Sequence, residues 1–299
     1  MPELPDIETY LFALRKRLVG QELKNVRIAS PFLLRSVEPK LETAFGKKVR
    51  EFERLGKRIV FVLEGDLYLV LHLMIAGRFR WGAPEAKIPG KLGLAAFDFD
   101  NGTLLLTEAS KKKRASLMLV HGETALRTLN PGGAEPFEIT FDAFESLLKA
   151  ENHTLKRSLT DPRILSGIGN AYSDEILHRA KLSPVLLTSR LTTEQTGRLF
   201  EAMKEVLTEW KERLIAQLAT DFPKKVTAFR PEMAVHGRFG QPCPVCGDHV
   251  QRIVFKDRET NYCATCQTGG RLLADRALSR LLKQDWPRSL EAMEELKGR

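Results

Sequence analysis

The chain has 299 residues, enough for two domains of ordinary size, and its 43% hydrophobic and 28% charged residues are typical of a soluble globular protein. Lys and Arg number 47 against 38 Asp and Glu, and the resulting net charge of +9 favours a polyanionic partner. No apolar run approaches the roughly 20 residues of a membrane span, and the N-terminus lacks the pattern of a signal peptide. We therefore expect a cytoplasmic protein without a membrane partner.

The N-terminal residues predict a helix that is directly preceded by a proline and a glutamate, Pro2 and Glu3. Apolar residues recur at helical spacing, at Leu4, Ile7, Leu11, Leu14 and Leu18. Gly20 is the stop signal. A helix packed on a core explains this spacing, but it does not explain the start MPELPDIETY, where Pro2 stands second and Glu3 follows it.

Residues 25 to about 125 read as a series of short strands. Examples are residues 58–63, 67–71 and 92–99, with turn signals at 64–66 and 101–102. Many short strands after one helix predict a two-layer β-sandwich.

The second half of the chain reads as helical and ends in a cysteine-rich module. Amphipathic spacing begins near residue 141 and continues to about residue 218, and a loop rich in Pro, Lys and Phe follows from residue 221 to 240. We therefore predict an α+β fold in four parts. These are a helix and β-sandwich domain at 1–130, a helical domain at 131–235, a zinc-finger β-hairpin at 236–270 and a helical extension at 271–299.

The four cysteines of the chain all lie within 24 residues, as Cys243, Cys246, Cys263 and Cys266. Two C-x2-C pairs separated by sixteen residues are a strong signal for tetrahedral zinc. Because all four positions are cysteines, the predicted zinc is structural, whereas a catalytic zinc keeps one position open. The intervening residues 250–255 and 259–262 can form a hairpin.

The segment GIGNAYSDEIL at residues 167–177 joins two helical patterns. Asn170 is a good candidate N-cap for the helix that follows, and free N–H groups at a helix start bind phosphate. Lys156 and Arg157 lie upstream. From this segment alone, an ordinary turn between two helices is slightly favoured.

A set of motifs stands in a fixed order along residues 1 to about 270. They are the MPELPDIET start, LGK at 55–57, HL through GR at 72–78, EP at 135–136, GIGNAYSDEIL, HGRFGQPC at 236–243 and the cysteine hairpin. This ordered set resembles the formamidopyrimidine-DNA glycosylase / endonuclease VIII family. In that family the GIGN segment belongs to a helix–two-turn–helix DNA-binding element. The resemblance therefore favours a DNA-binding role for this segment over an ordinary turn between two helices.

The resemblance implies a bifunctional glycosylase and abasic-site lyase of base-excision repair. After removal of Met1, Pro2 would be the nucleophile that forms a Schiff base, and β,δ-elimination would follow. Glu3 would protonate the sugar ring oxygen and Lys57 would act beside the lesion. Arg258 would contribute to catalysis and, with Asn170, would hold the phosphates that flank the flipped nucleotide.

The resemblance also implies the ligands and further contacts. We expect one structural Zn²⁺, double-stranded DNA with a damaged base or abasic site as partner, a monomer, and association with a bacterial nucleoid through DNA. Lys156, His72 and Arg114 complete the predicted DNA-binding residues. For His72, a structural hydrogen-bonding role is favoured over a catalytic one.

Several positions depart from the family pattern and leave the substrate open. Asp6 replaces a glutamate, Ile75 replaces a void-filling methionine, and EASKKKR at 108–114 replaces an arginine–phenylalanine loop. Oxidised or ring-opened purines, such as 8-oxoguanine and formamidopyrimidine, are weakly preferred as substrates. The alternatives are an oxidised-pyrimidine glycosylase, a non-catalytic protein that binds damaged DNA, and a zinc-hairpin RNA-binding module.

Overall fold

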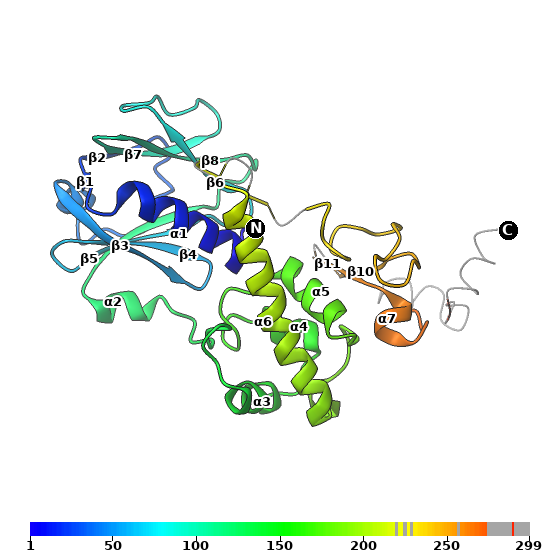
Figure 1. The fold of residues 1–299 in the computed structure, drawn as a ribbon. Coiled ribbons are helices and arrows are strands. Elements are labelled where there is room, and N and C mark those ends of the chain that lie inside the picture. Colours follow the sequence, from blue (N-terminus) through cyan, green and yellow to red (C-terminus); the bar gives the residue numbers. More distant parts are fainter. Residues whose placement is uncertain (219–220, 224–225, 228–229, 256–257, 274–288, 290–299) are drawn as a thin grey trace. The chain divides into compact units, whose positions relative to one another are not determined.

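The computed structural model describes residues 1–299 apart from 219–220, 224–225, 228–229, 256–257, 274–288 and 290–299. The chain divides into two compact units (Figure 1). The first comprises residues 1–133 and 208–228, and the second comprises residues 134–207 and 229–299. The predicted division into four parts stays a prediction, and its helical extension lies mostly outside the described residues.

The first unit is a helix with two antiparallel sheets, as predicted. Helix α1 covers Leu4–Leu18, η1 covers Leu41–Ala44 and α2 covers Glu123–Thr128. One sheet has the order β1 (Glu22–Leu23), β3 (Lys47–Leu55), β4 (Arg58–Leu63), β5 (Leu67–His72) and β9 (Ser116–His121). The other has the order β2 (Asn25–Ile28), β7 (Gly93–Phe99), β8 (Gly102–Glu108) and β6 (Gly77–Gly82).

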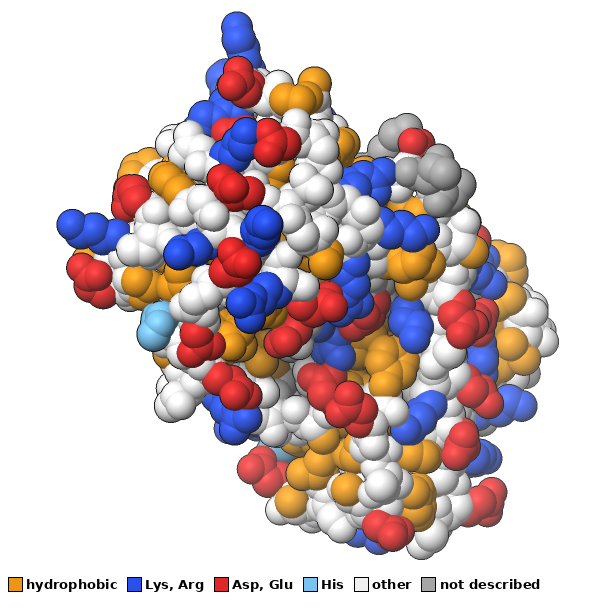
Figure 2. All heavy atoms as spheres, turned by 60° about the vertical axis from the view of Figure 1, so that its left-hand side comes forward, with side chains coloured by type: hydrophobic (Ala, Val, Ile, Leu, Met, Phe, Trp, Pro, Cys, Tyr) orange, Lys and Arg blue, Asp and Glu red, His pale blue; other side chains and the backbone are white. Residues whose placement is uncertain are grey.

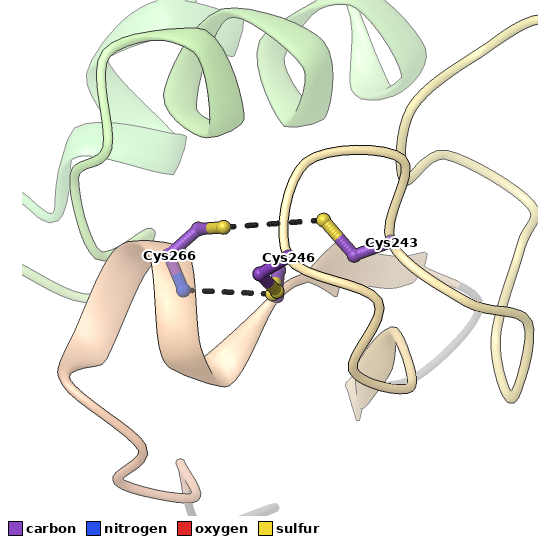
Figure 3. Close-up of side chains that lie close together, drawn as sticks. Cys243, Cys246 and Cys266 are labelled. Carbon is purple, nitrogen blue, oxygen red and sulfur yellow. Dashed lines mark hydrogen bonds between the residues drawn. The ribbon is translucent and has the colours of Figure 1, made fainter.

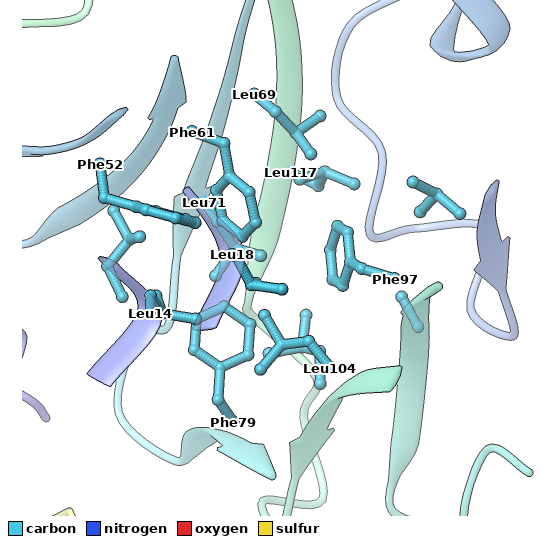
Figure 4. Packing of buried hydrophobic residues seen from close by; sticks show 14 of the residues in the cluster. Leu14, Leu18, Phe52, Phe61, Leu69, Leu71, Phe79, Phe97, Leu104 and Leu117 are labelled. Carbon is cyan, nitrogen blue, oxygen red and sulfur yellow. The ribbon is translucent and has the colours of Figure 1, made fainter. Parts of the chain in front are cut away.

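The core of the first unit contains side chains from both sheets and from α1 (Figure 4). Phe61 of β4 lies at its centre, with ring centroids 4.7 Å from Phe52 and 5.7 Å from Phe97. Phe52 and Phe61 belong to one sheet, whereas Phe97 belongs to the other. Alternate residues of each strand point between the layers, so this aromatic contact joins the two sheets.

The second unit contains helices and the cysteine hairpin. Its helices are α3 (Phe141–Ala150), α4 (Leu155–Thr160), α5 (Asn170–Arg179), η2 (Thr188–Arg190), α6 (Thr193–Ala216) and α7 (Ala264–Thr268). The end of α6, from Thr208, belongs to the first unit. Strands β10 (Gln251–Phe255) and β11 (Arg258–Tyr262) form the predicted hairpin. In the part of the chain that the structure describes, no helix combines the length and apolar character needed to cross a membrane.

Replacement of Phe61 by alanine tests the inter-sheet core. Because Phe61 is fully buried, we expect a loss of about 3–5 kcal/mol in the free energy of unfolding, from lost apolar burial and the cavity left behind. The matched control is Phe32→Ala, since Phe32 is 71% exposed, and its effect should stay within about 0.5 kcal/mol. Urea unfolding of both variants measures the difference, and equal losses would contradict this core assignment.

Candidate active site and zinc centre

The start of α1 is fixed by two buried carboxylates next to the N-terminus. Glu3 is the N-cap residue, and Asp6 at the third helical position accepts the backbone N–H of Glu3 at 3.0 Å. The two residues form a reciprocal capping box, which satisfies N–H groups that would otherwise lack a helical partner. Asp6 is 0% exposed and Glu3 is also buried. Asp6, which departs from the family pattern, therefore caps the N-terminus of this helix together with Glu3.

The N-terminal amine lies in a partly buried and charged environment. Burial lowers the pKa of the Met1 α-amine; Glu3 and Asp6 oppose this shift, whereas Arg78 and Lys57 add to it. A lower pKa leaves more of an amine neutral near neutral pH, and the neutral form is the nucleophile. The structure thus places Glu3 and Lys57 within electrostatic range of the terminus. Arg78 is not among the predicted site residues, because in the sequence it is only the last residue of the 72–78 motif.

Lys57 is at the tip of the β3–β4 hairpin. Leu55 pairs with Arg58, so the connection is the two-residue loop Gly56–Lys57, and Gly56 has the positive φ of 64° that such a turn requires. Arg54 links this tip to α1. Its Nε lies 2.8 Å from Glu8 Oε1 of α1, and its Nη1 donates to the Gly56 carbonyl at 3.2 Å. The position of the Lys57 turn is therefore tied to α1, the helix that directly follows Pro2 and Glu3.

His72 holds the tight turn between β5 and β6. Its Nδ1 accepts the backbone N–H of Met74 at 2.9 Å, and Met74 has a φ of 52°. Burial lowers the pKa of His72 to about 4, with further contributions from Arg58 and Lys57, so the ring is neutral at neutral pH. This agrees with the structural role favoured for His72, while a contact of this residue with DNA stays a prediction.

The same turn presents an aliphatic side chain to solvent. Ile75 is 54% exposed. Gly77 closes the turn, and a Cβ at this position would lie 2.2 Å from the Leu73 carbonyl oxygen, so no larger residue fits there. The tip that carries Ile75 is consequently a compact, glycine-dependent turn.

Glu108 organises the basic loop that follows β8. This carboxylate is 1% exposed and accepts the hydroxyl of Ser110 at 2.7 Å and the backbone N–H groups of Arg114 and Ala115 at 2.9 and 3.1 Å. The Nζ of Lys113 also donates to the Glu108 carbonyl. The side chain of Arg114 is exposed. Sequence reasoning missed Glu108 because it read the segment only as a run of charge.

In the second unit, Asn170 is not the helix cap that its sequence position predicts. Gly169 is the N-cap of α5 and Asn170 is its first residue. The amide Nδ2 of Asn170 instead donates to the Glu259 carbonyl of β11 at 2.6 Å. Local sequence could not indicate this acceptor, which lies 89 residues away in the chain. Asn170 therefore reaches the strand position beside Arg258, whose side chain lies outside the described part of the structure.

Lys156 lies against the same helix. Its Nζ donates to the Asn170 carbonyl at 2.6 Å and pairs with the buried Asp174 carboxylate at 2.5 Å. Asp174 also lies 2.8 Å from Nδ1 of His236. The Lys156 ammonium thus already has a buried anionic partner, and its role as a DNA ligand stays a prediction.

Glu175 is a further buried carboxylate that sequence reasoning passed over. It accepts three successive backbone N–H groups, from Ala234, Val235 and His236, at 2.7–2.9 Å. Burial raises the pKa of Glu175, although these three hydrogen bonds oppose that shift. The signal in the sequence was that Glu175 directly precedes the apolar residues Ile176 and Leu177, which indicates an acidic side chain close to the core. Its contacts fix the chain where it enters the cysteine module.

The four cysteines form a site suited to one zinc ion, and Cys243, Cys246 and Cys266 of this set are labelled in Figure 3. Their sulfur atoms all lie within 4.8 Å of one another, with Sγ–Sγ distances of 3.9 Å for Cys243–Cys266 and 3.4 Å for Cys246–Cys263. Tetrahedral zinc with bonds of about 2.3 Å separates its sulfur ligands by about 3.8 Å. The donor set leaves no open position, so the predicted structural Zn²⁺ and its four ligands are consistent with this geometry.

Charge on the face drawn in Figure 2 is mixed. Lys and Arg side chains are interspersed there with Asp and Glu, and no continuous basic patch covers that face.

Comparison with known proteins identifies the family. The formamidopyrimidine-DNA glycosylase N-terminal domain matches residues 1–114, its H2TH domain matches 133–214, and a zinc finger found in FPG and IleRS matches 240–269. The formamidopyrimidine-DNA glycosylases of Solibacter usitatus and Thermus thermophilus are 33% and 35% identical, over 89% and 90% of this chain and 99% and 100% of theirs. Among solved structures, a complex of Lactococcus lactis Fpg with DNA containing an abasic site has a TM-score of 0.79 and 26% identity, covering 89% of this chain and 99% of that one.

The chain belongs to the formamidopyrimidine-DNA glycosylase family. The predicted α+β fold, the class of enzyme (a DNA glycosylase of repair) and the structural zinc are thereby confirmed.

The pKa of His72 predicts a pH-dependent part of the stability. The unfolded ring takes up a proton as pH falls below about 6.5, whereas the folded ring stays neutral down to about pH 4. His72 therefore stabilises the fold fully above the unfolded pKa, and this contribution falls by about 2 kcal/mol between about pH 7 and pH 5. Urea unfolding at the two pH values should show a smaller loss for His72→Asn than for the wild-type chain. The control His121→Asn removes an exposed ring and should leave the loss unchanged; an unchanged loss in His72→Asn would contradict the prediction.

Proposed function

We propose that this protein excises oxidised bases from double-stranded DNA and cleaves the strand through a Schiff base at Pro2. The observation that carries this proposal is the partly buried chain terminus beside Pro2: burial lowers the pKa of the Met1 α-amine, Lys57 adds to that shift, and Glu3 opposes it. An ordinary α-amine has a pKa of about 7.7–8.0, whereas a lysine side chain, at about 10.4, would need a much larger shift to be neutral. An amine at the chain terminus therefore needs only a small lowering of its pKa to act as a nucleophile at neutral pH.

The chemistry follows from the secondary amine of Pro2. Its nitrogen forms a bond to C1′ of the damaged nucleotide, and the glycosidic bond breaks, with its electron pair leaving on the base. Glu3 delivers a proton to the sugar ring oxygen while the amine loses its own proton, so the ring opens to a cationic iminium. That iminium accepts the electron pair of the C2′–H bond as this proton is removed, and the 3′ phosphate leaves with the electron pair of its C3′–O bond. Removal of a proton from C4′ then expels the 5′ phosphate with the electron pair of its C5′–O bond. Water finally hydrolyses the iminium and restores the amine.

Positioning residues complete the proposed reaction. Glu3 follows Pro2 in the chain and is held by the capping box with Asp6, so its carboxyl group is presented to the reacting sugar with little loss of entropy. Lys57 acts from its hairpin tip beside the lesion. Asn170 and Arg258 contact the flanking phosphates, and Arg114 adds a basic contact from its exposed loop.

The substrate class rests on family membership and on general constraints. The base must leave the stack to be reached, and a damaged pair opens at the lowest cost. The relatives in Solibacter usitatus and Thermus thermophilus are named for formamidopyrimidine, and the related Lactococcus lactis protein binds DNA with an abasic site. The formamidopyrimidine in these names supports ring-opened purines as substrates of this chain, and we extend the proposal to oxidised purines.

Borohydride trapping tests the proposal. Wild-type protein lacking Met1 is mixed with duplex DNA that carries an abasic site, and borohydride reduces any iminium to a stable adduct. We expect a covalent adduct that peptide mass mapping assigns to the Pro2 nitrogen. Protein that retains Met1 should give no adduct at Pro2, because that nitrogen is then an amide.

The Pro2→Gly variant offers a primary amine and should give a weaker adduct and less strand cleavage. Binding to abasic DNA without any adduct in the wild-type protein would overturn the lyase proposal in favour of a non-catalytic damage-binding protein.

Ile75 tests how the flipped state is held. An aliphatic side chain at an exposed turn can fill the space that a flipped base leaves. Ile75→Ala should lower kcat/KM for excision from duplex DNA roughly tenfold, a loss of about 1.4 kcal/mol of transition-state stabilisation. It should have little effect on trapping with an abasic site in single-stranded DNA, where no base pair opens. Val37→Ala, at another exposed aliphatic residue of the same unit, is the control, and equal effects of the two variants would contradict this role.

A further inference from the structure

A histidine from α5 contacts one of the four cysteine sulfurs. The Nε2 atom of His178 lies 3.3 Å from Cys243 Sγ. His178 is 6% exposed, and Cys243 is also buried. We propose that His178 donates its Nε2–H to the Cys243 thiolate, and that this outer-sphere hydrogen bond helps to retain the zinc and anchors the cysteine module to α5.

The donor set of the site supports an outer-sphere role and argues against direct ligation. Four thiolates complete the tetrahedral shell of zinc, and a distance of 3.3 Å is that of an N–H···S hydrogen bond. Zn²⁺ with four thiolates carries a net charge of about −2, since each thiolate contributes one negative charge. Hydrogen bonds from N–H groups to such sulfurs are charge-assisted and offset the cost of burying that charge.

Other donors to the sulfurs come from the cysteine module itself. The backbone N–H of Cys266 donates to Cys263 Sγ at 3.5 Å, and backbone N–H groups of Val245 and Cys246 donate to Cys243. The His178 bond differs because its donor belongs to a helix more than 60 residues earlier in the chain, at a sequence separation of 65. It therefore joins the metal site to a separate element of the same compact unit.

Three residues one helical turn apart share this face of α5. Asn170, Asp174 and His178 are spaced at i, i+4 and i+8, which aligns their side chains along a helix. Asn170 donates to the Glu259 carbonyl of β11, Asp174 lies against His236, and His178 reaches Cys243. Of these three contacts, the one at His178 ends on a zinc ligand. The metal site is thereby joined to the helix that begins with Asn170.

This inference depends on the zinc centre and not on the proposed Schiff-base chemistry, so its test reads the metal directly. The zinc-loaded full chain is compared with His178→Leu, which removes the N–H donor, and with His178→Gln, which retains one. Leu177→Ala is the matched control, since it removes a buried side chain from the neighbouring position of α5 without touching the hydrogen bond.

Zinc affinity is measured by competition with a chelating dye, and the thiolate-to-metal charge-transfer band is recorded after replacement of zinc by Co²⁺. His178→Leu should bind zinc about 10- to 100-fold more weakly, the usual effect of losing an outer-shell partner. Its charge-transfer band should move to lower energy because the thiolate loses a donor. His178→Gln should recover part of both effects, and Leu177→Ala should leave the band in place.

An unchanged band in both His178 variants would overturn the proposal, even if zinc affinity fell, because lower affinity alone would reflect a packing role. If His178→Leu does not fold, the band of His178→Gln against that of Leu177→Ala decides the question. A shift in His178→Gln alone supports the hydrogen bond, and no shift in either variant overturns it.

Discussion

The capping box at the start of α1 is the constraint on which the candidate active site depends. The N-terminal nitrogen of a chain is normally poorly fixed, because few contacts hold a terminus. Here Glu3 and Asp6 satisfy each other's backbone N–H groups within a buried helix start, so the residue that directly follows Pro2 is held. The same helix carries Glu8, whose ion pair with Arg54 extends this order to the hairpin tip of Lys57. One helix thus orients both the terminus and its neighbouring cation.

The second unit uses one helix in a comparable way. The face of α5 that carries Asn170, Asp174 and His178 contacts three parts of the chain around the cysteine module, and Glu175 fixes the segment that leads into it. These contacts are mostly buried and involve charged or amide groups, so each would be costly if its partner were lost. The cysteine module is therefore connected to the helices of this unit through several side-chain contacts.

Buried polar groups also shape the loops that carry the candidate DNA contacts. Glu108 accepts backbone N–H groups of the basic loop. Neutral His72 accepts a backbone N–H of the turn that carries Ile75. In both places a side chain that is buried (Glu108) or half-buried (His72) determines the backbone, while the exposed side chains remain available to solvent. This arrangement separates the residues that set the shape of a loop from those that would contact a ligand.

Features that depend on local spacing could be predicted from the amino-acid sequence alone. The period of apolar residues predicted α1 from Leu4 to Leu18, alternation and turn signals predicted strands such as β4, and the spacing of the cysteines predicted the zinc ligands. Each of these follows from neighbours within a few residues or from a fixed ligand geometry. The ordered motifs indicated the family for the same reason, since they can be read along the chain.

Contacts between polar groups that lie far apart in the chain could not be predicted in this way, because they depend on three-dimensional packing. Asn170 looked like a helix cap, but Gly169 has the extended backbone of a cap residue and the Asn170 amide reaches β11. Asp6 was a departure of uncertain effect until its bond to the Glu3 N–H showed its structural role. The partners of Arg54 and His178 lie 46 and 65 residues away in the chain. Side-chain hydrogen bonds of this kind depend on how strands and helices pack, and no periodicity in the sequence records that packing.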